Sequence, residues 1–91
     1  MGMRDRYLEV TYRTGRLFAA YVYFPGLEGA KSARTESVGR GLVMDFAADG
    51  SPIGLEISAP GSVSLDAINA ALARFGQAGL SAKEIAPLAA A

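Results

Sequence analysis

The chain has 91 residues, a hydrophobic content of 51%, a charged content of 20% and no net charge. This length suits a single domain with one core, and the composition argues against intrinsic disorder. The sequence contains neither cysteine nor histidine, which excludes disulfides and thiol nucleophiles and removes the usual general base near neutral pH. We therefore expect one domain over residues 1–91, without a catalytic site, a cofactor or a metal site.

Hydropathy and charge distribution indicate the surroundings of the chain. No apolar run reaches 18 residues, so we expect a soluble, cytoplasmic protein without a membrane span. Residues 1–40 contain seven Lys and Arg against four Asp and Glu, whereas residues 41–91 contain two against five. The halves therefore carry +3 and −3, charges that we expect the fold to neutralise internally rather than use to steer a partner.

The first two predicted strands, residues 6–13 and 16–24, form a hairpin. Leu8, Val10 and Tyr12 alternate with polar residues, which is the period of a half-buried strand. A two-residue turn at Thr14-Gly15 would pair Leu17 with Tyr12 and place the odd-numbered residues of the second strand on the core face. The residues assigned to the core in this way are Leu17, Ala19, Tyr21 and Tyr23.

Residues 16–24 are unusual because they are apolar on both faces. The even-numbered residues Phe18, Ala20, Val22 and Phe24 would lie opposite the core face. A strand of this kind is normally covered on both sides. Two covers stay open: a second subunit, which predicts a homodimer, or the C-terminal tail of the same chain.

Residues 33–38, 41–48 and 52–58 are the remaining predicted strands. The last two form a hairpin that turns at Asp49-Gly50, a dipeptide typical of type I′ turns. This turn pairs Phe46 with Ile53, Met44 with Leu55 and Leu42 with Ile57, so that one face is entirely apolar. A slip of one residue would set apolar residues against Gly54 and Glu56, which is why the register is strongly specified.

The C-terminal part predicts a helix over residues 64–75, capped by Ser64 and stopped by Gly76. Its apolar stripe consists of Leu65, Ile68, Leu72 and Phe75. A capping box between Ser81 and Glu84, with Leu80 and Ile85 as a hydrophobic staple, predicts a short helical turn over 81–86. The predicted fold is α+β: an antiparallel β-meander of four to five strands with the C-terminal helix packed on one face.

Three carboxylates, Asp45, Asp49 and Glu56, are the candidate binding residues. In the predicted register Asp45 lies opposite Gly54, and Glu56 lies diagonally across on the same face. They would form an acidic binding patch or, in an alternative interpretation, the centre of a small-ligand or divalent-cation-dependent enzyme. The simpler interpretation is a solvated hairpin face, with Asp49 present because its side chain suits the turn.

The N-terminal half interleaves tyrosines with Arg4, Arg6, Arg13 and Arg16. Such a composition is typical of surfaces that stack bases and bind phosphates. However, the predicted faces place Tyr12, Tyr21 and Tyr23 in the core, so nucleic-acid binding is the less favoured alternative.

The run Gly41-Leu42-Val43-Met44-Asp45-Phe46-Ala47-Ala48-Asp49-Gly50, followed by Ile53-Gly54-Leu55-Glu56-Ile57, resembles a bacterial family, the domain of unknown function 2283. The matching positions are Asp45, Asp49, Gly50, Gly54 and Glu56. Ala47 stands where the family usually carries a second aspartate, which argues against a metal site. The Tyr-Asp signature of the family's N-terminal part is half met, by Tyr12 followed by Arg13.

The resemblance implies a small β-rich domain without an established activity. Members are associated with genes encoding toxins, which implies an antitoxin-like role and a toxin as a protein partner. The resulting hypothesis is a non-enzymatic protein-interaction module that forms a homodimer.

Overall fold

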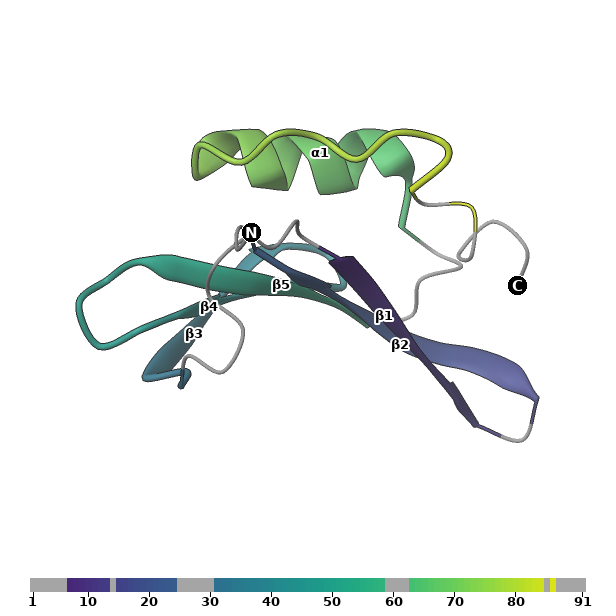
Figure 1. The fold of residues 1–91 in the computed structure, drawn as a ribbon, viewed down its shortest axis with the longest axis horizontal. Helices are drawn as coiled ribbons and strands as arrows, with labels where there is room; N and C mark the ends of the chain where they lie inside the picture. The colour runs from purple at the N-terminus through teal and green to yellow at the C-terminus, as the bar shows by residue number, and fades with distance from the viewer. Residues whose placement is uncertain (1–6, 14, 25–30, 59–62, 85, 87–91) are drawn as a thin grey trace, which may run out of the picture.

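In the part of the chain that the structure describes, five antiparallel strands form one sheet, and one helix lies along a face of that sheet (Figure 1). The computed structural model describes residues 7–13, 15–24, 31–58, 63–84 and 86. The elements are β1 (Tyr7–Arg13), β2 (Arg16–Tyr23), β3 (Arg34–Gly39), β4 (Leu42–Phe46), β5 (Pro52–Ser58) and α1 (Leu65–Arg74). The predicted α+β class, the antiparallel strands and the C-terminal helix are confirmed.

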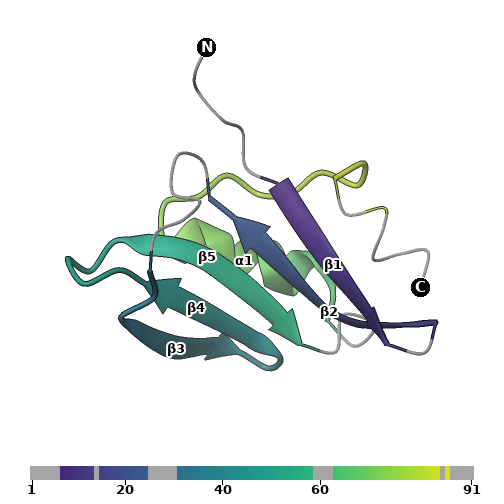
Figure 2. The same ribbon diagram turned by 60° about the horizontal axis from the view of Figure 1, so that its bottom comes forward.

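The order of strands across the sheet is β1-β2-β5-β4-β3 (Figure 2). It departs from a strictly sequential meander at one place, because β2 pairs with β5 rather than with β3. After β2, the second strand of the sheet, the chain begins β3 at the far edge and returns through β4 to β5, which lies in the middle. β1 and β3 are therefore the two edge strands.

The β1–β2 hairpin corrects the predicted faces of the second strand. Tyr12 pairs with Leu17 as expected, but a β-bulge follows, so that Thr11 pairs with Ala19 and Val10 with Ala20. The extra residue is Phe18. Because one extra residue inverts the alternation of side chains, the residues beyond the bulge point to the faces opposite to those predicted.

The inverted faces are evident from burial. Ala20, Val22 and Phe24 are 2%, 0% and 1% exposed and belong to the core, whereas Tyr21 and Tyr23 are only half-buried. Tyr12, also assigned to the core, is 54% exposed. The prediction that Tyr12, Tyr21 and Tyr23 lie in the core is wrong.

The β4–β5 hairpin keeps the predicted register through Asp45 and Gly54 but turns differently. Ala47 N donates to the Ser51 carbonyl (2.8 Å) and Gly50 N donates to the Ala47 carbonyl (2.9 Å). The loop is therefore residues 48–50, with Gly50 at φ +90°, rather than a two-residue type I′ turn. Phe46 consequently pairs with Pro52 instead of Ile53.

A second bulge at Ile53 compensates for the longer loop. Beyond it, Asp45 pairs with Gly54, Met44 with Leu55 and Leu42 with Ile57, as predicted. All six apolar residues expected in this part of the core are indeed buried, namely Leu42, Met44, Phe46, Ile53, Leu55 and Ile57. One added residue in the loop and one in β5 thus leave the faces of the rest of the hairpin unchanged.

The helix α1 begins and ends as the sequence predicts. Ser64 Oγ accepts a hydrogen bond from Ala67 N (3.1 Å). At the other end, Gln77 N donates to the Leu72 carbonyl and Gly76 N to the Ala73 carbonyl, the pattern of a Schellman motif, with Gly76 at φ +74°. Ile68 and Leu72 are fully buried against the sheet.

Residues 77–84 run back beside α1 and add Leu80 to the core (Figure 1). Asn69 holds this segment: its side chain donates to the Leu80 carbonyl (3.1 Å) and accepts from Leu80 N (2.7 Å). The predicted capping box is present, since Ser81 N donates to Glu84 Oε1 and Glu84 N to Ser81 Oγ. Ile85, the predicted staple partner of Leu80, lies outside the described residues.

None of the helices in the described part of the chain has both the length and the apolar character that crossing a membrane requires.

Candidate functional site

The face of the sheet opposite α1, hereafter the open face, carries the candidate binding residues. The register arranges its side chains in rows that cross the strands. One row contains Glu9, Tyr21, Glu56, Val43 and Ser37, and the next contains Tyr23, Gly54, Asp45 and Thr35. Of the described segments outside the sheet, α1 and residues 77–84 pack against the other face, the core face (Figure 1).

Tyr21 crosses from β2 over β5 to reach β4. Its hydroxyl donates to Asp45 Oδ2 at 2.6 Å, a short bond of the kind that an ionised acceptor makes. The strand between them carries Gly54, and a Cβ added there would overlap the Tyr21 ring. The glycine therefore supplies the space in which the ring lies flat across the sheet.

Tyr23 extends in the opposite direction. Its hydroxyl donates to Glu9 Oε1 on β1 at 2.7 Å. The rings of Tyr21 and Tyr23 contact each other, with centroids 4.6 Å apart and planes tilted by 55°. Two carboxylates and a ring contact thus fix both tyrosines in single orientations across four strands.

Burial and the charges around Tyr21 keep its hydroxyl protonated. Burial raises the pKa of Tyr21 well above its ordinary value, and the hydrogen bond to Asp45 and the negative charge of Asp45 raise it further. The neighbouring Glu56 acts in the same direction. Tyr21 is therefore a hydrogen-bond donor and not a general base.

Of the predicted binding residues, Asp45 and Glu56 share the open face as expected, opposite Gly54 and Val43 respectively. Asp45 is half-buried and bonded to Tyr21, whereas Glu56 is exposed. Asp49 lies apart from them in the hairpin loop, where its Oδ1 accepts from Ser51 N (2.9 Å). This hydrogen bond lowers the pKa of Asp49, and it gives the residue a role in the turn.

Among the described residues, no group of three or more Asp or Glu side chains comes close enough together to hold a metal ion. Hard cations such as Ca²⁺ need six or more oxygen ligands. The pair Asp45 and Glu56 offers two carboxylates, one of which already accepts the Tyr21 hydroxyl.

Sequence reasoning missed Tyr21, Tyr23 and Glu9 as residues of this face. Simple alternation assigns the tyrosines to the core, because the bulge at Phe18 leaves no clear mark in the sequence. A signal was nevertheless present: buried tyrosine hydroxyls need hydrogen-bond partners, and Ala20, Val22 and Phe24 on the alternative face need none.

Comparison with known proteins places part of this chain in a family. Residues 19–59 match the family described as Protein of unknown function (DUF2283). The match begins within β2, runs to the end of β5 and includes Tyr21, Asp45, Gly54 and Glu56. No curated protein and no solved structure shows a significant match to the chain. Residues 19–59, and with them most of the open face, are a DUF2283 domain.

Proposed function

We propose that this protein is a non-enzymatic protein-interaction module that binds its partner through the open face. The observation that supports this proposal is the pair of ordered tyrosines at the centre of the face, Tyr21 and Tyr23, with Val43 half-buried beside them. Tyrosine is enriched at the centres of protein interfaces, where it contributes a large contact area at a small entropic cost. The bonds to Asp45 and Glu9 lower that cost further because the rings are already fixed.

The charges of the open face favour a basic partner surface. Glu9, Asp45 and Glu56 all lie on it, and the side chains of Lys and Arg bind both carboxylates and aromatic rings. The same carboxylates oppose a phosphate backbone, which argues against nucleic-acid binding even though the tyrosines face outward. Of the arginines in that alternative, Arg4 and Arg6 lie outside the described residues.

The resemblance to domain of unknown function 2283 gives this proposal a specific form, an antitoxin-like role. The partner would then be a toxin whose basic surface the open face covers.

We also propose that the protein forms a homodimer. The contact between the two copies is an edge strand of the sheet and not the apolar face of β2. The core face of β2 packs against α1, so an edge strand offers the better route. The exposed edge strand β3 carries Arg34 and Glu36, which pair with each other at 3.1 Å. Antiparallel pairing of two β3 strands about Thr35 would set Arg34 of each copy opposite Glu36 of the other. Sedimentation of wild type and Glu36→Arg tests this dimer; a wild-type monomer contradicts it.

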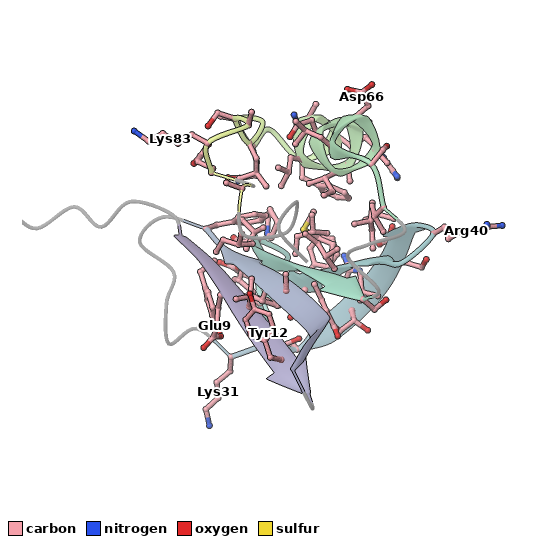
Figure 3. The ribbon with its side chains drawn as sticks, turned by 90° about the vertical axis from the view of Figure 1, so that its right-hand side faces the viewer. Glu9, Tyr12, Lys31, Arg40, Asp66 and Lys83 are labelled. Carbon is pink, nitrogen blue, oxygen red and sulfur yellow. The ribbon has the colours of Figure 1, made fainter. Side chains whose placement is uncertain are left out.

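The proposed function is tested by affinity capture from the native host with charge-reversed variants. Glu56→Arg reverses an exposed charge on the open face, and Asp66→Arg reverses an exposed charge on the outer side of α1 (Figure 3). We expect a specific protein to be retained by wild type and Asp66→Arg and to be lost with Glu56→Arg. Retention of the same proteins by all three contradicts the proposal.

A cation-dependent enzyme centred on Asp45 and Glu56 is the rival from a different class. Isothermal titration with Mg²⁺, Mn²⁺ and Ca²⁺ distinguishes the two. We expect no saturable binding at millimolar metal. A saturable site that disappears in the Asp45→Ala/Glu56→Ala variant, while partner binding persists, would support the rival.

A further inference from the structure

A cavity of about 470 Å³ lies between α1 and the β3–β4 turn, on the opposite side of the sheet from the open face. Its walls are mostly apolar. The sheet side contributes Val38 and Leu42, the segment before the helix contributes Val63, and the helix contributes Ala67, Ala70 and Ala71. Small-molecule sites typically enclose roughly 300–1,000 Å³ and have such apolar linings.

The cavity exists because only one flank of α1 is covered. Asn69 faces the flank along which residues 77–84 run, and it binds the backbone of Leu80 there. On the other flank the helix presents only alanines between its ends, with Ala67 and Ala70 exposed. Because alanine extends no further than Cβ, these side chains leave the space toward β3 and β4 unfilled.

Two arginines complete the lining and give the cavity its charge. Arg74, in the last turn of α1, donates from Nη1 to the Val38 carbonyl at 3.3 Å, and its guanidinium lies 5.5 Å from the centroid of the Phe75 ring. Arg40 projects from the β3–β4 turn (Figure 3). None of the residues that the structure places around the cavity is acidic.

Arg74 retains donors for a ligand. A guanidinium carries five N–H groups in a rigid fork that matches a carboxylate, and the described contacts of Arg74 occupy one of them. The contacts with Val38 and Phe75 hold it at the cavity. The site therefore combines an apolar floor with two cations, Arg74, which its contacts hold in place, and Arg40 on the β3–β4 turn.

We propose that this cavity binds a small amphiphilic anion, with an apolar body against the alanine flank of α1 and a carboxylate at Arg74 and Arg40. Charge complementarity argues for this class, since both charged lining residues are cationic. The inference does not depend on the proposed partner binding, because it concerns the other side of the sheet.

Sodium octanoate is the probe, and ¹⁵N-labelled full-length protein reports its binding by NMR. We expect saturable shifts at the amides of Val38, Ala67 and Ala70. Octanol, which has the same tail without the charge, and octylamine, with the opposite charge, should each bind at least about tenfold more weakly. Equal shifts with all three compounds, or shifts that do not saturate, overturn the proposal.

Matched variants locate the site. Ala70→Leu fills the cavity from an exposed position, and Ala73→Leu makes the same change at an exposed position of α1 outside the lining. Octanoate should bind roughly tenfold more weakly to Ala70→Leu and as in wild type to Ala73→Leu.

The double variant Arg40→Gln/Arg74→Gln tests the charge of the cavity. It should weaken the binding of octanoate but not that of octanol, and Lys83→Gln is the charge control. Unchanged octanoate binding in both the leucine and the glutamine variants contradicts the proposal.

The variant Glu56→Arg separates this inference from the proposed function. Its open-face charge is reversed while the cavity is intact, so octanoate should bind as in wild type. Loss of octanoate binding in this variant would contradict the assignment to the cavity.

Discussion

Individual residues of the open face depend on one another through Tyr21. Its ring needs the missing side chain at Gly54, and its hydroxyl needs the carboxylate of Asp45. The pKa of Tyr21 is raised, first by burial and then by Asp45. A substitution at any of these three positions should therefore affect the other two.

Tyr21 should ionise at an unusually high pH. Because its folded pKa lies above the unfolded value, the native state loses stability as the pH rises through the ordinary tyrosine range near 10 toward the folded pKa. Absorbance titration of the phenolate should show a late step that is missing in Tyr21→Phe. Tyr12→Phe removes an exposed hydroxyl and should leave that step in place. A late step that persists in Tyr21→Phe would contradict the assignment.

Gly54→Ala should lower the free energy of unfolding by about 1–3 kcal/mol, because the new Cβ overlaps the Tyr21 ring. In the Tyr21→Ala background the same change should cost clearly less, since the obstructing ring is absent. Urea unfolding of the two single variants and the double variant measures this coupling. Additive losses would show that the ring does not depend on the glycine.

At the scale of elements, the β4–β5 hairpin shows how a turn and a bulge act together. The loop of residues 48–50 is one residue longer than a type I′ turn, and the bulge at Ile53 restores the register. Asp49 stabilises the loop by accepting from Ser51 N. Since this bond favours the carboxylate, it lowers the pKa of Asp49.

Asp49→Ala should be less stable than wild type at neutral pH. A lowered folded pKa means that the carboxylate stabilises the hairpin above the ordinary aspartate pKa of about 3.9 and that this contribution is lost as the pH falls through the folded value. Thermal unfolding between neutral and strongly acidic pH should show the gap to wild type closing in acid. Asp49→Asn retains an acceptor oxygen and should show a smaller gap with little pH dependence. A constant gap for Asp49→Ala would contradict this role.

At the scale of the whole molecule, the sheet and α1 share one hydrophobic core. The residues matched to DUF2283 supply the sheet side of it, including Met44, Leu55 and Ile57, while Ile68 and Leu72 of α1 cover them. Without the helix these side chains would be exposed to water. Such exposure costs a free energy of about 25 cal/mol per Å² of apolar surface.

A fragment of residues 19–59 should therefore not fold alone, although it contains the whole family match. We expect random-coil amide shifts and no cooperative thermal transition for the fragment. Full-length Leu72→Ala should still fold but lose about 2–5 kcal/mol, because it leaves a cavity at a fully buried position. Cooperative unfolding of the fragment would show that the helix is dispensable.

Local periodicity determined most of this architecture. The helix with its caps at Ser64 and Gly76, the capping box at Ser81 and the pairing of Met44 with Leu55 all follow from contacts between residues near in sequence. The shared face of Asp45 and Glu56 follows from the same register. Such features are readable because alternation and capping act within a few residues.

Tertiary structure decided which strands are neighbours and which way the tyrosines point. The pairing of β2 with β5 joins residues far apart in sequence, so no local pattern specifies it. The bulge at Phe18 turns Ala20, Val22 and Phe24 toward α1, where apolar side chains are buried without a polar cost, and it turns Tyr21 and Tyr23 toward Asp45 and Glu9, which accept their hydroxyls. The open face thus exists because polar hydroxyls and the helix cannot share one side of the sheet.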